Sequence, residues 1–460
     1  MLFTTTRFFL FFAVVLTLFY SAPRSWRKFI LLAASYYFYM AWNAKFVLLL
    51  LTLTIIDYTA ALWIQRVPPG TKRKLLLIAG LSANLSFLGF FKYYNFLAGN
   101  VATLLGMPVH SFGLDIILPM GISFHTFQSM SYVVDVYRGE QAAISNPIDY
   151  ALFISFFPQL VAGPIVRAGE FFADLYHWRR PGNEQLLRGF LLVVLGLTKK
   201  VALADQFARL SDSYFNNLAG HPGALAAWSG VLAFAAQIYF DFSGYTDMAI
   251  GLALLLGFHF PENFRRPYLA GSITEFWHRW HMSLSRWLRD YLYIPLGGNR
   301  HGTLKTYRNL MLTMLLGGLW HGASWNFVIW GGYHGALLSL ERAARPRVNL
   351  PSFVYPLRVL VTFILVCIGW VFFRAATLGD SVHVVYQMFS GRAGTGLWYS
   401  WHFWLVCVLL LLALVEEKLG WFERVVTAPA WVYATVTVVL LLCVELIGVT
   451  ESIPFVYFQF

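Results

Sequence analysis

Charged side chains are scarce in this chain of 460 residues. They make up 12% of it, whereas hydrophobic residues make up 58% and the mean hydropathy is +0.60. Soluble domains usually contain about 25% charged and about 45–50% apolar residues. The composition therefore excludes an ordinary soluble domain and predicts an all-α, polytopic membrane protein. The length would suit two or three soluble domains, but we expect one bundle of membrane helices over residues 1–460.

Acidic residues are also few, because 22 Asp and Glu stand against 34 Lys and Arg and leave a net charge of +12. The basic residues lie in short loops between apolar runs, as the positive-inside rule describes. The excess charge therefore predicts an orientation in the bilayer, and we expect no nucleic-acid partner. The basic clusters at 24–28 and 66–74 are predicted to be cytoplasmic, with the N-terminus outside.

Cysteine is nearly absent, with only Cys367, Cys407 and Cys443, all within apolar runs. No CxxC pair and no histidine stand at a ligand spacing, which excludes a disulfide framework and a cysteine metal site. The first apolar run, near residues 8–20, lacks a convincing cleavage site, so we interpret it as a retained span rather than a signal peptide.

Apolar runs of suitable length predict the spans, although the run at 28–42 is short for a full crossing. The predicted spans are 8–22, 28–42, 45–65, 75–91, a weak one at 96–118, 187–204, runs within 225–260, 310–325 with a continuation to 340, 359–373, 403–415 and 432–449. The aromatic tail at 451–460 is predicted to be interfacial.

Two further runs are broken by Pro and Gly. Residues 119–128 contain Pro119, Gly121 and His125, and we expect an irregular buried backbone there, with His125 as a packed core residue. Residues 150–167 contain three such breaks in an apolar part too short to span, which favours a re-entrant element.

Ionisable groups inside apolar segments are costly and need partners. Asp241 and Asp247 lie in the run 225–260, and we expect structural ion pairs with arginines downstream. The candidate partners are Arg265, Arg266, Arg279 and Arg289.

Residues 271–335 carry the strongest signal for chemistry. Glu275, His278 and His281 lie on a predicted helix, capped by Ser272 or Thr274, on which the two histidines would share a face. His321 follows in a long apolar run among glycines, and histidine is the side chain best suited to move a proton near neutral pH.

These residues leave three functions open. His278, His281 and Glu275 offer at most three ligands without a familiar spacing, so we expect no metal site. His321 with Asp241 and Asp247 would suit a relay in a proton-coupled transporter, and His321 alone would suit the general base of an acyltransferase. The residue chemistry does not decide between a transporter and an acyltransferase.

Several motifs together resemble one family. They are Trp277–Ser285, Leu319–Gly322, Gly121–Phe124, Phe127–Gln128, Asp135–Gly139, Phe156–Gln159, Ala162–Arg167, Asp241–Tyr245, Asp247–Gly251, Pro261–Phe264, Trp287–Arg300 and Gly369–Arg374. In this combination the chain is similar to the membrane-bound O-acyltransferase family, in its bacterial polysaccharide-acetylation branch.

The resemblance implies a ring of roughly 11–13 tilted transmembrane and re-entrant helices around a central tunnel, with a catalytic core at about 119–340 between flanking spans 1–118 and 341–460. It implies that His321 is the catalytic histidine and that His281 holds the second site position. The other residues that it places at the donor site or along the tunnel are Trp277, His278, Trp280, Asn299, Arg300, Trp320 and Ser324.

The same resemblance implies the reaction. Acetyl-CoA would serve as the cytoplasmic donor substrate, with no resident cofactor. The acetyl group would cross the bacterial inner membrane to a periplasmic acetyltransferase partner, for O-acetylation of an exopolysaccharide such as alginate or a cellulose-like polymer. The alternative is a proton-coupled or passive conduit for acetyl groups that performs no covalent chemistry.

Overall fold

A computed structural model describes residues 1–160, 163–344, 352–397, 400–449 and 453–458, with the backbone alone at 352, 400–407 and 458. Every regular element in these ranges is a helix, and none is a strand. Five helices in the described part are long and apolar enough to cross a membrane. The prediction of an all-α polytopic membrane protein is therefore confirmed.

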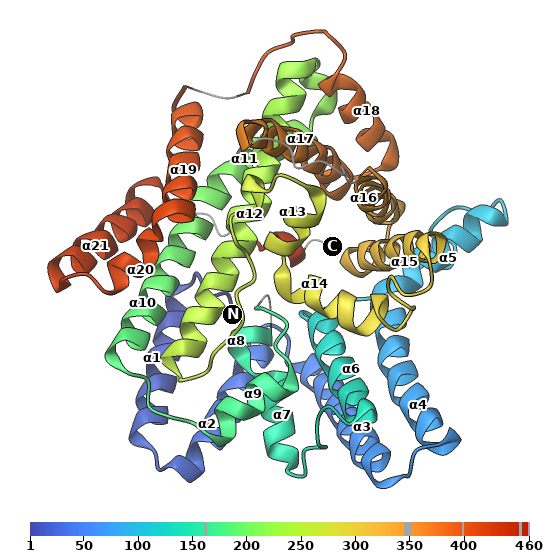
Figure 1. Cartoon of the computed structure of the whole chain (residues 1–460), viewed down its shortest axis with the longest axis vertical. Coiled ribbons are helices and arrows are strands. Elements are labelled where there is room, and N and C mark those ends of the chain that lie inside the picture. Colours follow the sequence, from blue (N-terminus) through green and yellow to red (C-terminus); the bar gives the residue numbers. More distant parts are fainter. Residues whose placement is uncertain (161–162, 345–351, 398–399, 450–452, 459–460) are drawn as a thin grey trace. The chain divides into compact units, whose positions relative to one another are not determined.

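The chain forms two compact units, of which the first comprises residues 1–182 and 249–261. Its helices, shown in blue to green in Figure 1, are α1 (Thr6–Ser21), α2 (Arg24–Met40), η1 (Ala44–Phe46), α3 (Val47–Arg66), α4 (Thr71–Leu88), η2 (Gly89–Tyr93), α5 (Tyr94–Leu104), α6 (Ile122–Arg138), α7 (Pro147–Ser155), α8 (Phe157–Leu160) and α9 (Ala168–Tyr176).

The second unit comprises residues 183–248 and 262–460. Its helices are α10 (Asn183–Thr198), η3 (Lys199–Ala204), α11 (Asp205–Phe215), η4 (Leu218–Gly220), most of α12 (Ala224–Leu255), η5 (Pro267–Leu269), α13 (Ile273–Arg279), α14 (Met282–Leu288), η6 (Arg289–Tyr293), α15 (Thr303–His321), α16 (Trp325–Ala343), η7 (Ser352–Val354), α17 (Tyr355–Arg374), α18 (Leu378–Met388), α19 (Ser400–Leu419), α20 (Trp421–Val426), α21 (Ala430–Ile447) and η8 (Val456–Phe458).

The single domain over 1–460, its division at 119 and 340, the ring and the tunnel stay predictions.

Local sequence signals set several helix starts. The Thr5 side chain accepts a hydrogen bond from the Phe8 N–H at the start of α1, and Ser272 accepts one from Glu275 at the start of α13. Asn146 caps α7 with Pro147 at the first helical position, where a missing N–H costs nothing. The predicted cap at Ser272 is therefore confirmed.

The structure corrects two predicted elements of the first unit. The span expected at 96–118 ends early, since α5 stops at Leu104 and residues 107–119 form turns and loop. The irregular backbone expected at 119–128 is instead a helix from Ile122 onward, started by Gly121 with φ 71°. A Cβ on Gly121 would come within 2.4 Å of the Leu160 carbonyl oxygen, so only glycine fits.

The segment expected to be re-entrant contains two short helices. α7 and α8 are separated at Phe156, and every residue from 149 to 160 is buried. Neither helix reaches the length needed to span a bilayer. Val161 and Ala162 lie outside the described residues, as do 451, 452, 459 and 460 of the predicted interfacial tail. His125 on α6 is 1% exposed, as expected of a core residue.

The core of the second unit is strongly aromatic. Phe276 and Trp280 from the α13 region, Trp330 from α16 and Trp370 from α17 belong to one buried cluster with residues of α12. The last described residues, 453–458, lie among the helices of this unit (Figure 1). This cluster positions both histidines of the candidate site.

Candidate active site

The helix predicted to carry both His278 and His281 is broken between them. α13 ends at Arg279, and His281 has φ 44°, which is uncommon for a residue other than glycine. α14 then starts at Met282. His278 is exposed whereas His281 is fully buried, so the prediction that the two histidines share one helix face is wrong.

Asn263 holds this break in place. Its carbonyl accepts the Met282 N–H at 2.9 Å, and its side-chain Oδ1 accepts the Ser283 N–H at 3.1 Å and the Ser283 hydroxyl at 2.9 Å. The Nδ1 of His281 lies 3.2 Å from the same Oδ1. Because that oxygen already accepts from the Ser283 N–H, the Nδ1 of His281 must be the donor.

His281 is therefore a neutral imidazole whose Nε2 carries the lone pair. Burial lowers the pKa of His281 to about 3, so the ring stays uncharged near neutral pH. Its ring lies edge-on to Phe242, with 4.7 Å between the ring centroids. A neutral, oriented histidine in an apolar setting suits a hydrogen-bonding role beside a reacting group.

His321 is the last residue of α15 and is 5% exposed. Four aromatic rings surround it at centroid distances of 5.0–5.6 Å, namely Trp320, Trp330, Phe373 and Tyr457. The chain leaves the helix at once through Gly322, whose backbone is extended. This exit leaves His321 at a helix end and inside an aromatic shell.

Glycines bring α15 and α16 together at this point. A Cβ on Gly318 would lie 2.2 Å from the Phe327 carbonyl oxygen, and one on Gly331 would lie 2.3 Å from the Met314 carbonyl oxygen. A Cβ on Gly322 would meet the Phe327 ring at 2.1 Å. The glycines around His321 therefore serve close helix packing, which fixes the histidine against α16.

The structure places the two histidines in one neighbourhood. Trp320 contacts both, with ring centroids 6.2 Å from His281 and 5.0 Å from His321. A second path of contacts runs from His281 to Phe242 at 4.7 Å, from Phe242 to Tyr457 at 4.4 Å and from Tyr457 to His321 at 5.6 Å. The catalytic roles predicted for the two histidines stay predictions.

The other predicted tunnel residues differ in their surroundings. Trp280 is 1% exposed and packs on Trp370 at 4.9 Å, and Trp277 packs on Trp330 at 5.7 Å. Neither ring contacts the His321 ring, so we interpret Trp277 and Trp280 as packing residues. Trp320, in contrast, contacts both histidine rings.

The remaining predicted positions are more accessible. Ser324 is partly exposed before α16, Asn299 and Arg300 are exposed in the turn before α15, and His278 is exposed. Within the described residues, no group of three His, Cys, Asp or Glu side chains could hold a metal ion.

The buried acids pair with lysines rather than with the arginines predicted downstream. Lys200 lies 2.8 Å from Asp241 and 2.7 Å from Asp205, and Lys199 lies 2.5 Å from Asp247. Gly196 on α10 and Gly244 on α12 let the two backbones approach so closely that these lysines reach the acids. Sequence alone did not give this pairing, because Lys199 and Lys200 lie about 40 residues from Asp241 and Asp247 along the chain.

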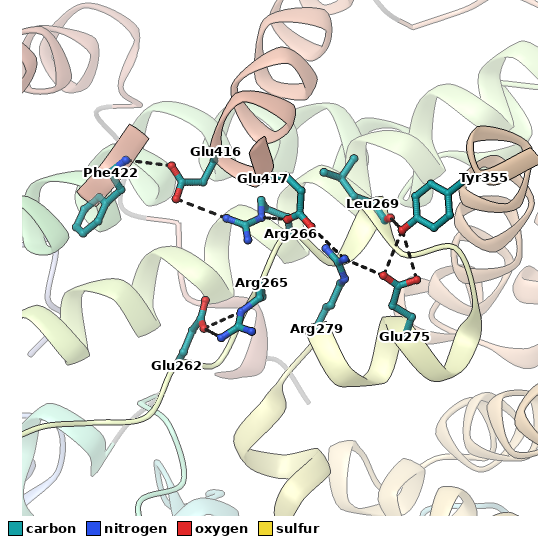
Figure 2. Close-up of polar contacts among 10 residues, drawn as sticks. All are labelled: Glu262, Arg265, Arg266, Leu269, Glu275, Arg279, Tyr355, Glu416, Glu417 and Phe422. Atoms are coloured by element: carbon teal, nitrogen blue, oxygen red, sulfur yellow. Dashed lines mark hydrogen bonds and ion pairs between the residues drawn. The ribbon is translucent and has the colours of Figure 1, made fainter. Parts of the chain in front are cut away.

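The predicted arginine partners have other contacts. Figure 2 shows Arg279 bound to Glu275 at 2.8 Å and to Glu417 at 3.1 Å, while Arg266 contacts Glu416 and Glu417. Burial lowers the pKa of Arg279, but Glu417 and Glu275 outweigh it and leave that pKa above its ordinary value. Arg289 pairs with its neighbour Asp290.

This cluster fastens α13 to distant parts of the chain. The hydroxyl of Tyr355 on α17 donates to the Glu275 carboxylate at 3.2 Å, and Glu416 accepts the Phe422 N–H at 3.0 Å between α19 and α20 (Figure 2). The cluster therefore supports the segment that ends in His281.

Sequence reasoning missed Asn263 and Tyr457 as site residues. Asn263 lies within the motif Pro261–Phe264, which contributed to the family resemblance but suggested no role. Tyr457 was interpreted only as part of an aromatic tail. Nothing local in either segment reveals its contact with a histidine far away in the chain.

Comparison with known proteins defines the class. Residues 76–379 match the profile of MBOAT, the membrane-bound O-acyltransferase family. The chain belongs to this family. Asn263, His281 and His321 lie within the matched residues, and Tyr457 lies outside them.

Individual relatives show the similarity in more detail. A probable alginate O-acetylase AlgI of Pseudomonas aeruginosa is 46% identical over 401 residues, covering 85% of this chain and 74% of the relative. A peptidoglycan O-acetyltransferase of Helicobacter pylori is 41% identical over 398 residues, covering 80% and 73%. A teichoic acid D-alanyltransferase of Bacillus subtilis is 29% identical over 276 residues, covering 55% and 68%.

Proposed function

We propose that this protein is an O-acetyltransferase that takes acetyl groups from cytoplasmic acetyl-CoA. It passes them across the bacterial inner membrane to a periplasmic acetyltransferase partner, which acetylates an exopolysaccharide. The observation that carries the proposal is His321, a buried histidine at a helix end that shares its neighbour Trp320 with a second, oriented histidine, His281. The alginate O-acetylases among the relatives favour an alginate-type polymer.

The donor site follows from charge. Arg300, Lys305 and Arg308 lie exposed around the start of α15, and cations of this kind suit the phosphates of CoA. The acetyl thioester would extend from these cations toward His321 at the other end of the same helix. Burial of His321 among aromatic rings keeps water away from the thioester.

The reaction needs one base. His321 takes the proton of the acceptor hydroxyl while the hydroxyl oxygen bonds to the acetyl carbon. The carbon–sulfur bond breaks, and the proton passes from His321 to the sulfur, so that CoA leaves as the thiol. Burial keeps His281 neutral and Asn263 orients its ring, so its Nε2 can accept a hydrogen bond from a reacting group.

The ion pairs argue against a proton relay through the acids. Asp241 and Asp247 each form an ion pair with a lysine. These pairs join α12 to η3 and give both acids a structural role, so no proton transfer is needed to explain them. The contacts therefore favour the acyltransferase over the proton-coupled transporter.

The test is His321→Ala in cells that make the acetylated polymer. We expect ester-linked acetate in the polymer to fall to background while a blot shows normal protein in the membrane. His383→Ala is the matched control, because His383 is an exposed histidine on α18 of the same unit. Preserved acetylation in His321→Ala would contradict the proposal that His321 is the general base and would favour a passive conduit.

A further inference from the structure

Two hydrogen-bond donors beside His321 are buried without a partner. They are the Tyr457 hydroxyl and the Trp330 indole N–H, and neither makes a hydrogen bond anywhere in the described part of the chain. Their rings lie 5.6 Å and 5.0 Å from the His321 ring. A buried donor without a partner has lost its hydrogen bond to water without a replacement, so such groups at a site need an explanation.

Several other ring donors of this unit do have acceptors. The Tyr268 hydroxyl donates to the Ala235 carbonyl at 2.6 Å, and the Trp370 N–H donates to the Tyr268 hydroxyl at 3.1 Å. The Trp228 N–H donates to the Met388 carbonyl at 3.0 Å. The indole N–H of Trp277 in the same core also lacks an acceptor in the described part of the chain, but Trp277 packs on Trp330 and has no ring contact with His321. The rings of Tyr457 and Trp330 both flank His321.

A hydrogen bond to a buried ion pair holds the segment that carries Tyr457. The Val456 N–H donates to the Asp241 carboxylate at 2.6 Å, and Asp241 is itself paired with Lys200. Phe455 packs on Tyr245 at 4.6 Å, and Tyr457 packs on Phe242 at 4.4 Å. These contacts come from α12 and η3, so a buried ion pair orders the segment that brings the hydroxyl to the site.

We propose that the Tyr457 hydroxyl and the Trp330 indole N–H bind the carbonyl oxygen of the acyl group that reacts at His321. Attack on a thioester turns that oxygen into an oxyanion, and donors fixed in advance in a dry site stabilise it strongly. Neither the hydroxyl nor the indole loses its proton in the step, so His321 still carries the only proton that moves. The inference rests on the proposed acetyl transfer and adds the groups that polarise the thioester carbonyl.

The first experiment uses the purified full-length protein in nanodiscs. CoA thiol release from acetyl-CoA is measured over a range of acetyl-CoA concentrations, with excess glycerol as the acceptor hydroxyl. The proteins compared are the wild type, His321→Ala and Tyr457→Phe, which removes only the hydroxyl. We expect Tyr457→Phe to lower kcat by about 100-fold, as losing an oxyanion donor does, with KM changed less than about twofold. Trp330→Phe should lower kcat in the same way.

Tyr433→Phe is the matched control, because the Tyr433 hydroxyl on α21 donates to the Leu187 carbonyl and lies exposed. Unchanged kcat in Tyr457→Phe would overturn the inference. So would a reduced yield of folded protein with unchanged kcat per folded molecule, since that shows a role in packing alone. If the wild type releases no thiol, or His321→Ala is fully active, the proposed acetyl transfer itself fails.

Discussion

At the scale of single residues, the backbone of His281 is under strain that its neighbours maintain. The left-handed region costs a residue with a Cβ about 1–2 kcal/mol. Hydrogen bonds from Ser283 and Met282 to Asn263 hold the turn and recover this cost. Such conformations persist where the surrounding structure over-determines them, often at functional sites. The strain therefore agrees with a site that fixes the His281 ring.

This strain predicts an unusual order of stability. His281→Gly should be more stable than His281→Ala by about 1 kcal/mol, because glycine adopts φ 44° freely and alanine does not. Melting of purified protein, followed by size-exclusion chromatography, measures the difference. At His383, in the helix α18, the order should reverse, since alanine favours helix over glycine by about 1 kcal/mol. Equal stability of the two His281 variants would refute the strain.

The residues of the site were only partly predictable. His321 and His281 could be selected because ionisable groups are rare in so apolar a chain, and the structure places both around Trp320. The hydrogen bond that ties His281 to Asn263 could not be predicted, because a hydrogen bond between separate segments leaves no local pattern in the sequence. The lysine partners of Asp241 and Asp247 were missed for the same reason.

At the scale of elements, apolar runs in the sequence predicted which segments are helical better than they predicted where the helices end. Long apolar runs gave α3, α12, α17 and α21, because hydrocarbon demands internally bonded backbone. The break between α13 and α14 was missed, since Trp280 and His281 continue a helical pattern. The loop at 262–266 ends α13 there. Its Arg265 N–H donates to the Arg279 carbonyl, and its Asn263 carbonyl accepts the Met282 N–H on the other side of the break.

The hairpin of α15 and α16 gives an element-scale prediction. Gly318→Ala should destabilise the protein by about 1–3 kcal/mol and abolish activity, because its Cβ would overlap the Phe327 carbonyl and move His321. Gly332→Ala is the control on the facing helix, where the new Cβ meets only Leu315 Cδ2 at 3.5 Å. It should leave stability equal or improve it, since alanine favours helix. Thermal melting and acetyl-CoA turnover check both, and normal turnover in Gly318→Ala would contradict close packing at His321.

At the scale of the whole molecule, the distribution of basic residues predicts how the chain lies in the membrane. In the first unit, α1 leads to the basic cluster at 24–28, and α3 and α4 flank the cluster at 66–74. If α1, α2 and α3 each cross the bilayer, both clusters share one side, and the positive-inside rule makes that side cytoplasmic. The turn at 41–46 then faces outward.

If cytoplasmic acetyl-CoA is the donor, as proposed above, the basic residues before and within α15 are expected to face the cytoplasm. Single cysteines placed in a variant without native cysteines test this at three exposed positions. We expect a membrane-impermeant maleimide to label Ala44→Cys in intact spheroplasts, and to label Lys72→Cys and Lys305→Cys only after permeabilisation. Labelling of Lys305→Cys in intact spheroplasts would separate the cations from the CoA pool and remove the proposed donor site. Labelling of Lys72→Cys alone would reverse the first unit and leave the donor site untouched.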